Sequence, residues 1–243
     1  MVGGVPRDGD GEPCHDRVVA EPPGESSVEV EDHPSERAAN LLADHLRRAV
    51  ETRGRATLAV SGGHTGPPML AALASADLAW DHITVFQVDE RVAPDGDPAR
   101  NADALVGFPA RVNLMPVTEP DLEQAASRYA AELPDQFDVV HLGMGPDGHT
   151  ASWPPGDPVI KSTEPVALSG EYQGHVRMTI TVPVVNAARA RVVLITGADK
   201  APAVATWLTT SSSDLPISRV KAAETIVILD AAAAADLPST AGG

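Results

Sequence analysis

ATLAVSGGHTGPPMLAALAS, at residues 56–75, is the stretch from which we predict the fold. Its first five residues form a short apolar run, as in a buried strand, and the run ends at SGG in residues 61–63. Pro67 and Pro68 then suit the first turn of a helix, because the N–H that proline lacks is unbonded in that turn anyway. The stretch therefore predicts a strand, a glycine-rich turn and a helix that ends near Ser75.

The alternation of strand and helix continues on both sides of this stretch. Residues 28–30 are consistent with a short strand, residues 38–50 carry apolar side chains at helical spacing, and Gly54 stands where a C-terminal cap belongs. Further strands are predicted at residues 83–88, 137–142, 176–182, 192–196 and 225–229, and helices at residues 121–133 and 199–208. Because this pattern indicates βαβ units, we predict an α/β fold with a doubly wound, mainly parallel sheet flanked by helices in a single domain.

The chain divides into a short tail and this domain. Residues 1–25 are rich in Gly, Pro, Asp and Glu and show no apolar periodicity, so they cannot bury enough surface to offset the entropy lost on ordering. We therefore expect a flexible N-terminal tail at residues 1–25 and the α/β domain at residues 26–243.

The charge of the chain limits its partners. With 18 Lys and Arg against 34 Asp and Glu, the formal net charge is -16, which repels nucleic acids and anionic membranes. Cys14 is the only cysteine, no apolar run approaches the roughly 18 residues of a membrane span, and the N-terminus lacks the apolar core of a secretion signal. We expect a cytoplasmic monomer or small homo-oligomer with no nucleic-acid or membrane partner, in which a few well-placed cations would meet any anionic substrate.

Three polar loops directly follow predicted strands, and in open α/β sheets ligands bind beyond the carboxyl ends of the strands. The first loop, SGGHT at residues 61–65, combines glycines, which let backbone N–H groups approach a ligand, with the hydroxyls of Ser61 and Thr65. It is either a phosphate cradle or an ordinary Gly-Gly turn. The second loop, DER at residues 89–91, is either part of a site or a solvated charge cluster.

The third loop, GMGPDGHTAS at residues 143–152, is the most specific feature of the chain. Its three glycines expose the backbone, and Asp147 lies two residues before His149. A neighbouring carboxylate can set the tautomer and pKa of a histidine for proton transfer near neutral pH. The alternative is a glycine-rich turn with a surface histidine, but the position of the loop favours His149 as a catalytic residue.

Together these motifs resemble 6-phosphogluconolactonase, a family that belongs to a larger group with glucosamine-6-phosphate deaminase. The resemblance rests on SGGHT at residues 61–65, VDERV at residues 88–92 with Asn101 beyond it, and GMGPDGHTAS at residues 143–152. Further matches are Arg177, GADK at residues 197–200 and LPISRV at residues 215–220. The resemblance covers about residues 28–235, and DGHTAS is its most specific part.

The resemblance implies an enzyme that hydrolyses 6-phospho-D-glucono-1,5-lactone to 6-phosphogluconate in the oxidative pentose phosphate pathway. It implies that His149 is the general base that activates water, that Arg91 stabilises the oxyanion, and that Asp147 orients His149 or the sugar hydroxyls. The implied substrate-binding residues are Ser61, Gly62, Gly63, His64, Thr65, Asp89, Arg177 and Lys200. Of these, the glycine-rich loop, Arg177 and Lys200 would hold the 6-phosphate. This chemistry needs no cofactor and no metal, and the eight histidines show no metal-ligand spacing on a helix.

Two segments depart from the family pattern. His64 and Gly66 replace a serine and a proline, which changes the phosphate loop, and Trp153-Pro154 replaces Leu-Phe, which we expect to alter the pocket wall. The related deaminase carries a glutamate five residues after its motif histidine, where this chain has Pro154, which cannot exchange a proton.

A different class of function is a non-catalytic sugar-phosphate-binding module, of the kind found in transcription regulators. Such a regulator needs a DNA-binding domain of about 50 residues or more. Only the 25 residues of the predicted tail precede the fold here. The set of His149, Asp147 and Arg91 also favours an enzyme over a binding module.

Overall fold

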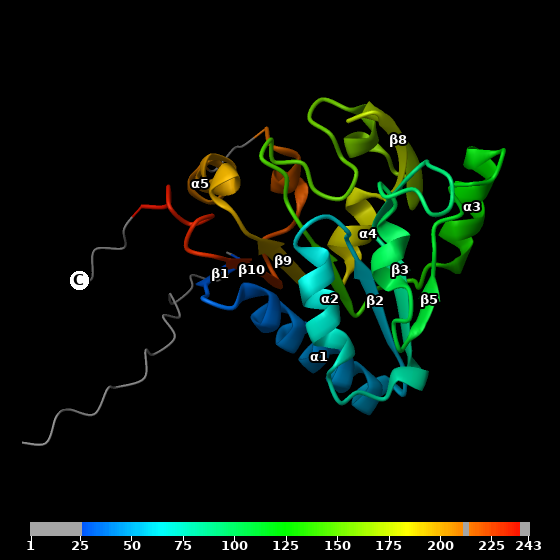
Figure 1. Ribbon diagram of the computed structural model, residues 1–243, viewed down its shortest axis with the longest axis horizontal. Coiled ribbons are helices and arrows are strands. Elements are labelled where there is room, and N and C mark those ends of the chain that lie inside the picture. The colour runs from blue at the N-terminus through cyan, green and yellow to red at the C-terminus, as the bar shows by residue number, and fades with distance from the viewer. Residues whose placement is uncertain (1–25, 211–213, 239–243) are drawn as a thin grey trace, which may run out of the picture.

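The computed structural model describes residues 26–210 and 214–238, and the predicted tail at residues 1–25 lies outside the described part of the chain. At its centre is a seven-stranded sheet in the order β1-β10-β9-β6-β2-β3-β5, in which every neighbouring pair is parallel. Its strands are β1 (Ser27–Val30), β2 (Ala56–Val60), β3 (Ile83–Gln87), β5 (Arg111–Asn113), β6 (Val139–Leu142), β9 (Arg191–Ile195) and β10 (Thr225–Leu229). Helices cover both faces (Figure 1), which confirms the predicted doubly wound α/β fold.

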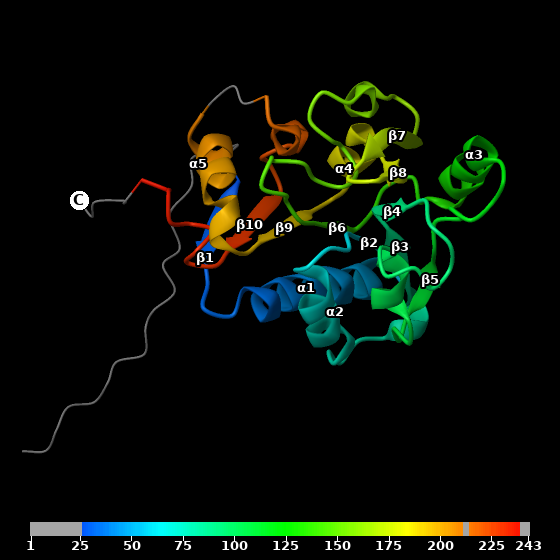
Figure 2. The ribbon, with the colours of Figure 1, turned by 45° about the horizontal axis from the view of Figure 1, so that its top comes forward.

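The helices are α1 (Pro34–Arg53), α2 (Gly66–Ala74), α3 (Leu122–Glu132), α4 (Val182–Ala187) and α5 (Ala201–Thr209). α1 and α2 lie on one face of the sheet, and α4 and α5 lie on the other (Figure 2). Local sequence fixes their ends: Gly54 adopts φ 72° after α1, a conformation that glycine tolerates, and Asp121 accepts a hydrogen bond from the Gln124 N–H at the start of α3. The long helices therefore lie close to their predicted positions.

Two apolar cores lie on the two faces of the sheet, because side chains alternate along each strand. In β2, Leu58 and Val60 belong to the core that includes α1 and α2, whereas Ala59 belongs to the core on the opposite face. A sheet covered on both faces needs strands that are apolar along their whole length. This requirement explains why the short apolar runs of the sequence predicted the sheet.

A second sheet, with three antiparallel strands in the order β4-β8-β7, was not predicted. Its strands are β4 (Asp89–Arg91), β7 (Val166–Tyr172) and β8 (His175–Ile180). The strand expected at residues 176–182 belongs to this sheet, and it ends at Ile180 because α4 begins at Val182 with Pro183 in its first turn. β7 and β8 form a hairpin whose two turn residues, Gln173 and Gly174, both have positive φ, as tight hairpin turns require.

Candidate active site

The order of the parallel sheet reverses between β2 and β6. From β2 the chain continues outward through β3 and β5, and from β6 it continues in the other direction through β9 and β10. Ligands of doubly wound folds bind at such a switch point, beyond the carboxyl ends of the strands. The loops that follow β2 and β6 are the predicted loops at residues 61–65 and 143–152. They pack closely there, since a Cβ atom at Gly143 would lie 3.5 Å from Thr65 Oγ1.

His149 and Asp147 form a close pair in the second of these loops. The distance from His149 Nδ1 to Asp147 Oδ1 is 2.6 Å. When Nδ1 donates its proton in this bond, Nε2 keeps a lone pair, and no partner for Nε2 is found among the described residues. The ring lies directly over Gly145, where an added Cβ would come within 2.1 Å of it. With the proton on Nδ1, this loop presents Nε2 as a proton acceptor.

Tyr172, at the end of β7, completes this cluster, and sequence reasoning missed it. Its hydroxyl donates to Asp147 Oδ2 at 2.6 Å and lies 3.2 Å from His149 Nδ1. Burial, together with the carboxylate of Asp147, raises the pKa of Tyr172 to about 12, so the phenol remains a donor at neutral pH. Burial alone would raise the pKa of Asp147, but the hydrogen bonds from Tyr172 and His149 outweigh it and lower that pKa. Asp147 is therefore a carboxylate with a donor on each oxygen.

Arg91 and Arg177 face each other across the β4–β8 pair, where they are register partners. Arg91 Nη1 donates to Ala99 O at 2.7 Å and to Asn101 Oδ1 at 2.9 Å. Arg177 Nη2 donates to the backbone of Tyr172 at 3.3 Å, and its guanidinium lies 4.9 Å from the centre of the Tyr172 ring. Burial and the charge of Arg91 lower the pKa of Arg177. The small sheet thus brings two cations together beside the histidine cluster.

Asp89 and Glu90 are buried, so the alternative of a solvated charge cluster at residues 89–91 is wrong. Only 5% of Asp89 is exposed, and its Oδ2 accepts a hydrogen bond of 2.7 Å from Ser152 Oγ. Burial raises the pKa of Asp89, although Ser152, Arg91 and Arg177 oppose that effect. The structure thus brings the predicted binding residue Asp89 close to both arginines, with most of its surface covered.

Glu90 has a structural role that the sequence did not reveal. Its carboxylate accepts hydrogen bonds from the backbone N–H groups of Arg91, Asn101 and Ala102, at 2.7 to 2.9 Å. It also pairs with Arg100 Nε at 3.1 Å. These bonds fix the segment that carries Asn101, and Asn101 in turn holds Arg91. The sequence gives one hint, because Glu90 stands between the predicted site residues Asp89 and Arg91. An acidic residue at this place looks the same in a sequence whether its side chain is buried or exposed.

The glycine-rich loop contacts this cation cluster through Asn101. A Cβ atom at Gly62 would lie 2.1 Å from Asn101 Oδ1, so only glycine fits beside it. His64 is exposed, whereas the hydroxyl of Ser61 is buried with no partner among the described residues. Thr65 precedes α2, and because Pro67 and Pro68 in its first turn carry no N–H, the backbone donors for an anion come from the glycine-rich loop and Gly66.

Lys200 belongs to the same end of the molecule as the glycine-rich loop. Its Nζ pairs with Asp199 at 2.6 Å. The hydrogen bond from Lys200 lowers the pKa of Asp199, and electrostatic interaction with His64 adds to this lowering. The predicted phosphate residues therefore form two groups: Lys200 lies with His64, and Arg177 lies with Arg91 and Tyr172.

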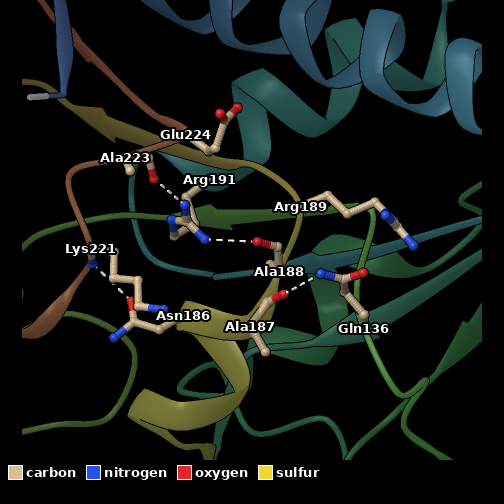
Figure 3. Close-up of a pocket in the computed structure, with 9 residues that line it drawn as sticks. All are labelled: Gln136, Asn186, Ala187, Ala188, Arg189, Arg191, Lys221, Ala223 and Glu224. Carbon is tan, nitrogen blue, oxygen red and sulfur yellow. Dashed lines mark hydrogen bonds between the residues drawn. The ribbon is translucent and has the colours of Figure 1, made fainter. Parts of the chain in front are cut away.

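A separate cavity of about 640 Å³ lies at the amino ends of β9 and β10, away from the switch point (Figure 3). Its buried cation, Arg191, donates to Thr225 Oγ1, to the carbonyl of Ala188 and to that of Ala223. These bonds occupy the Arg191 guanidinium, and the other cations of the lining are Arg189, which pairs with Asp138 at 3.5 Å, and Lys221. In the described part of the chain, no group of three or more His, Cys, Asp or Glu side chains could hold a metal ion. No helix there is long and apolar enough to cross a membrane.

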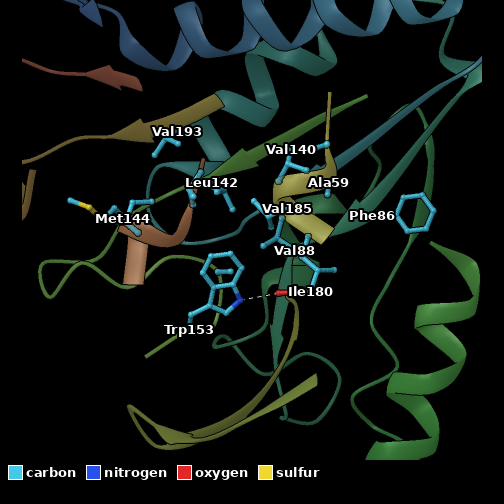
Figure 4. Close-up of a cluster of buried hydrophobic side chains, with 14 of the residues drawn as sticks. Ala59, Phe86, Val88, Val140, Leu142, Met144, Trp153, Ile180, Val185 and Val193 are labelled. Atoms are coloured by element: carbon cyan, nitrogen blue, oxygen red, sulfur yellow. Dashed lines mark hydrogen bonds between the residues drawn. The ribbon is translucent and has the colours of Figure 1, made fainter. Parts of the chain in front are cut away.

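Trp153-Pro154 replaces Leu-Phe of the family pattern, and its tryptophan lies in the apolar core. The expectation that this replacement alters the pocket wall is therefore wrong for Trp153. Trp153 is fully buried in the apolar core opposite α1 and α2, and its Nε1 donates to Ile180 O at 2.9 Å (Figure 4). The indole thereby joins the histidine loop to the end of β8. It supports both elements from beneath without lining the site.

A proton acceptor beside clustered cations at a switch point is typical of α/β enzymes whose substrates are small anions. The chain belongs to the family described as glucosamine-6-phosphate isomerases/6-phosphogluconolactonase, which it matches over residues 29–228. It is 34% identical to a 6-phosphogluconolactonase of Nostoc sp. over 222 residues, covering 83% of this chain and 92% of that protein. A 6-phosphogluconolactonase of Streptomyces coelicolor is 34% identical over 236 residues, covering 84% and 90%.

Solved structures show the same fold at lower identity. A 6-phosphogluconolactonase from Shewanella baltica superposes with a TM-score of 0.77 at 23% identity, covering 85% of this chain and 98% of that one. A monomeric glucosamine-6-phosphate deaminase superposes with a TM-score of 0.74 at 22% identity, covering 87% and 99%. The fold is therefore common to both activities, and the residues of the site must distinguish them.

Proposed function

We propose that this chain is a 6-phosphogluconolactonase, which hydrolyses 6-phospho-D-glucono-1,5-lactone to 6-phosphogluconate in the oxidative pentose phosphate pathway. The observation that carries the proposal is the 2.6 Å contact between His149 Nδ1 and Asp147: with the proton on Nδ1, Nε2 can accept one, and Arg177 lies against Tyr172 in the same cluster. Relatives that are 34% identical over most of their length carry this name, which supports the same conclusion.

In the proposed reaction, a water molecule attacks the lactone carbonyl carbon while its proton passes to His149 Nε2. The carbonyl oxygen becomes an oxyanion, which a guanidinium, that of Arg91 in our assignment, stabilises. The tetrahedral intermediate then collapses, the bond between the carbonyl carbon and the ring oxygen breaks, and His149 returns the proton to the leaving oxygen. Asp147 holds the imidazole and balances its positive charge between the two transfers.

The proposed phosphate site is the loop of Gly62 to Thr65 with Lys200. Backbone N–H groups of the loop and the positive end of the α2 dipole favour negative charge, and Lys200 adds a cation that is only partly exposed. A chain of net charge -16 repels a phosphate dianion elsewhere on its surface, so these local groups carry the recognition. Arg177 would contribute from the other side of the substrate.

The deaminase alternative lacks its proton carrier. The position five residues after His149 is Pro154, which is buried and has no group that exchanges protons. A non-catalytic binding module would have no need of the bonded pair His149–Asp147. Neither alternative is favoured by an observation of its own.

The deciding experiment measures 6-phosphogluconate formation from freshly made lactone with a coupled dehydrogenase, against the spontaneous background. We expect wild-type protein to exceed that background by orders of magnitude and to release no ammonia from glucosamine 6-phosphate. Hydrolysis at the background rate would reject the proposal. Ammonia release would favour the deaminase.

We also propose that the protein acts in the cytoplasm as a monomer or small homo-oligomer, without cofactor, nucleic acid or membrane. The acidic surface and the single cysteine support this proposal. Light scattering after gel filtration measures the oligomeric state, and a particle larger than a tetramer would contradict it.

A further inference from the structure

Tyr172 holds a central position in the site, although the proposed chemistry does not yet use it. Its hydroxyl donates to Asp147 Oδ2 at 2.6 Å, and its ring packs edge-on against the His149 ring with a centroid distance of 5.3 Å. The same ring also contacts Arg177, whose guanidinium lies 4.9 Å from the ring centre. One side chain therefore contacts the base, its carboxylate and a cation.

We propose that Tyr172 is a positioning residue that sets the strength of the base and holds Arg177 in place for the substrate. The inference rests on the proposed function, because it assigns this role for lactone hydrolysis. Its hydroxyl acts on the His149–Asp147 pair, and its ring acts on Arg177. The two parts of one side chain thus have separate effects on turnover and on substrate affinity.

The hydroxyl effect follows from hydrogen bonding. Asp147 is about one-third exposed and could rotate, but donors on both of its oxygens fix the carboxylate. The phenol also withdraws negative charge from Asp147, which makes the protonated imidazole less stable. The titratable groups that face His149 are Asp147 in the same loop and Tyr172 on β7, and the charge of Arg177 on β8 acts on both of them. Without the phenol, His149 should hold its proton to higher pH.

The ring effect follows from the environment of Arg177. Arg177 is 3% exposed, its Nε has no hydrogen-bond partner among the described residues, and the cation Arg91 stands opposite. Its Nη2 donates to the Gln173 side chain at 3.1 Å and to the Tyr172 backbone, so the ring acts together with these bonds. An aromatic face attracts a buried cation, and the attraction grows as water is removed. The Tyr172 ring therefore holds Arg177 in a position that repulsion from Arg91 opposes.

Two substitutions separate these effects. Tyr172→Phe removes the hydroxyl and keeps the ring, whereas Tyr172→Leu removes both. Glu171→Gln is the matched control, because Glu171 is exposed on the same hairpin. Each variant is checked for folding by circular dichroism, its kcat and KM are measured with the lactone, and the His149 ring is titrated by NMR.

In Tyr172→Phe we expect the titration midpoint of His149 to move up by roughly 0.5 to 1 pH unit, with the acid limb of kcat moving equally. We expect kcat to fall about tenfold as Asp147 loses its orientation, and KM to stay within about twofold. In Tyr172→Leu, KM should in addition rise about fivefold. Glu171→Gln should match wild type.

An unchanged or lowered midpoint in Tyr172→Phe would overturn the role in setting the base. Equal KM values in Tyr172→Phe and Tyr172→Leu would show that the Tyr172 ring does not hold Arg177 in place for the substrate. The NMR titration needs no substrate, so it decides the first role even if wild-type protein failed to hydrolyse the lactone. That failure would reject the proposed function alone.

Discussion

Replacing His149 by alanine should abolish most turnover and leave the fold intact. A positioned base contributes about 10²–10⁴-fold to such a reaction. The bond of 2.6 Å to Asp147 already fixes the imidazole, so we expect a kcat loss of at least about 100-fold, which raises the barrier by about 3 kcal/mol. The loop should persist because main-chain bonds hold it, including Gly145 N to His149 O at 2.9 Å and Gly148 N to Gly145 O at 3.0 Å.

The assay is coupled lactone hydrolysis across pH 5 to 8, with the background subtracted, for wild type, His149→Ala and His64→Ala. His64 is the internal control, because it is exposed in the glycine-rich loop and should affect KM alone. Wild-type kcat should fall on acidification, since a protonated imidazole cannot accept a proton, and His149→Ala should lose this pH dependence. If His149→Ala kept most of its turnover while His64→Ala abolished it, the assignment of His149 as the general base would be wrong.

Three further predictions concern binding, stability and metals. Arg177→Ala should raise KM about tenfold or more, and unphosphorylated gluconolactone should be a poor substrate; equal rates on both lactones would remove the phosphate site. Burial lowers the pKa of His141 to about 4, below the roughly 6.5 of an unfolded histidine, so the unfolded chain binds the extra proton and stability should fall by about 3 kcal/mol as pH drops from 7 to 4. Urea unfolding should show a shallower pH dependence in His141→Leu, and identical slopes would refute this assignment. Prolonged chelation should leave activity unchanged, and recovery of lost activity with zinc or magnesium would contradict that prediction.

The parallel sheet could be predicted because its signal is local. A strand covered on both faces must be apolar throughout, so runs such as residues 56–60 and 192–196 identify strands by themselves. Glycine and proline then mark the turns and helix starts between them. The loops of the site follow from the same pattern, because they come directly after such strands.

The antiparallel sheet could not be predicted because its pairing is not local. Asp89 pairs with Thr179, 90 positions further along the chain, and β4 has only three residues. Nothing in the sequence near residues 89–91 indicates this partner, so the burial of Glu90 could not be predicted, and Tyr172 lay outside every predicted strand and site. The available signals were weak: Tyr172 is one of two tyrosines, and it stands beside a Gln-Gly turn.

The two sheets contribute different parts of the site, and the arginine pair explains why both are needed. Arg91 and Arg177 repel each other as register partners in a partly buried environment, which costs stability, and Asp89 on β4, whose pKa burial raises, offsets this repulsion only in part. An anion that arrives from the switch point would supply the missing negative charge. In our proposal, the parallel sheet places His149 at that point, and the antiparallel sheet holds an excess of positive charge there that an oxyanion would relieve. Electrostatic stabilisation that is built in before the substrate binds needs no rearrangement during the reaction.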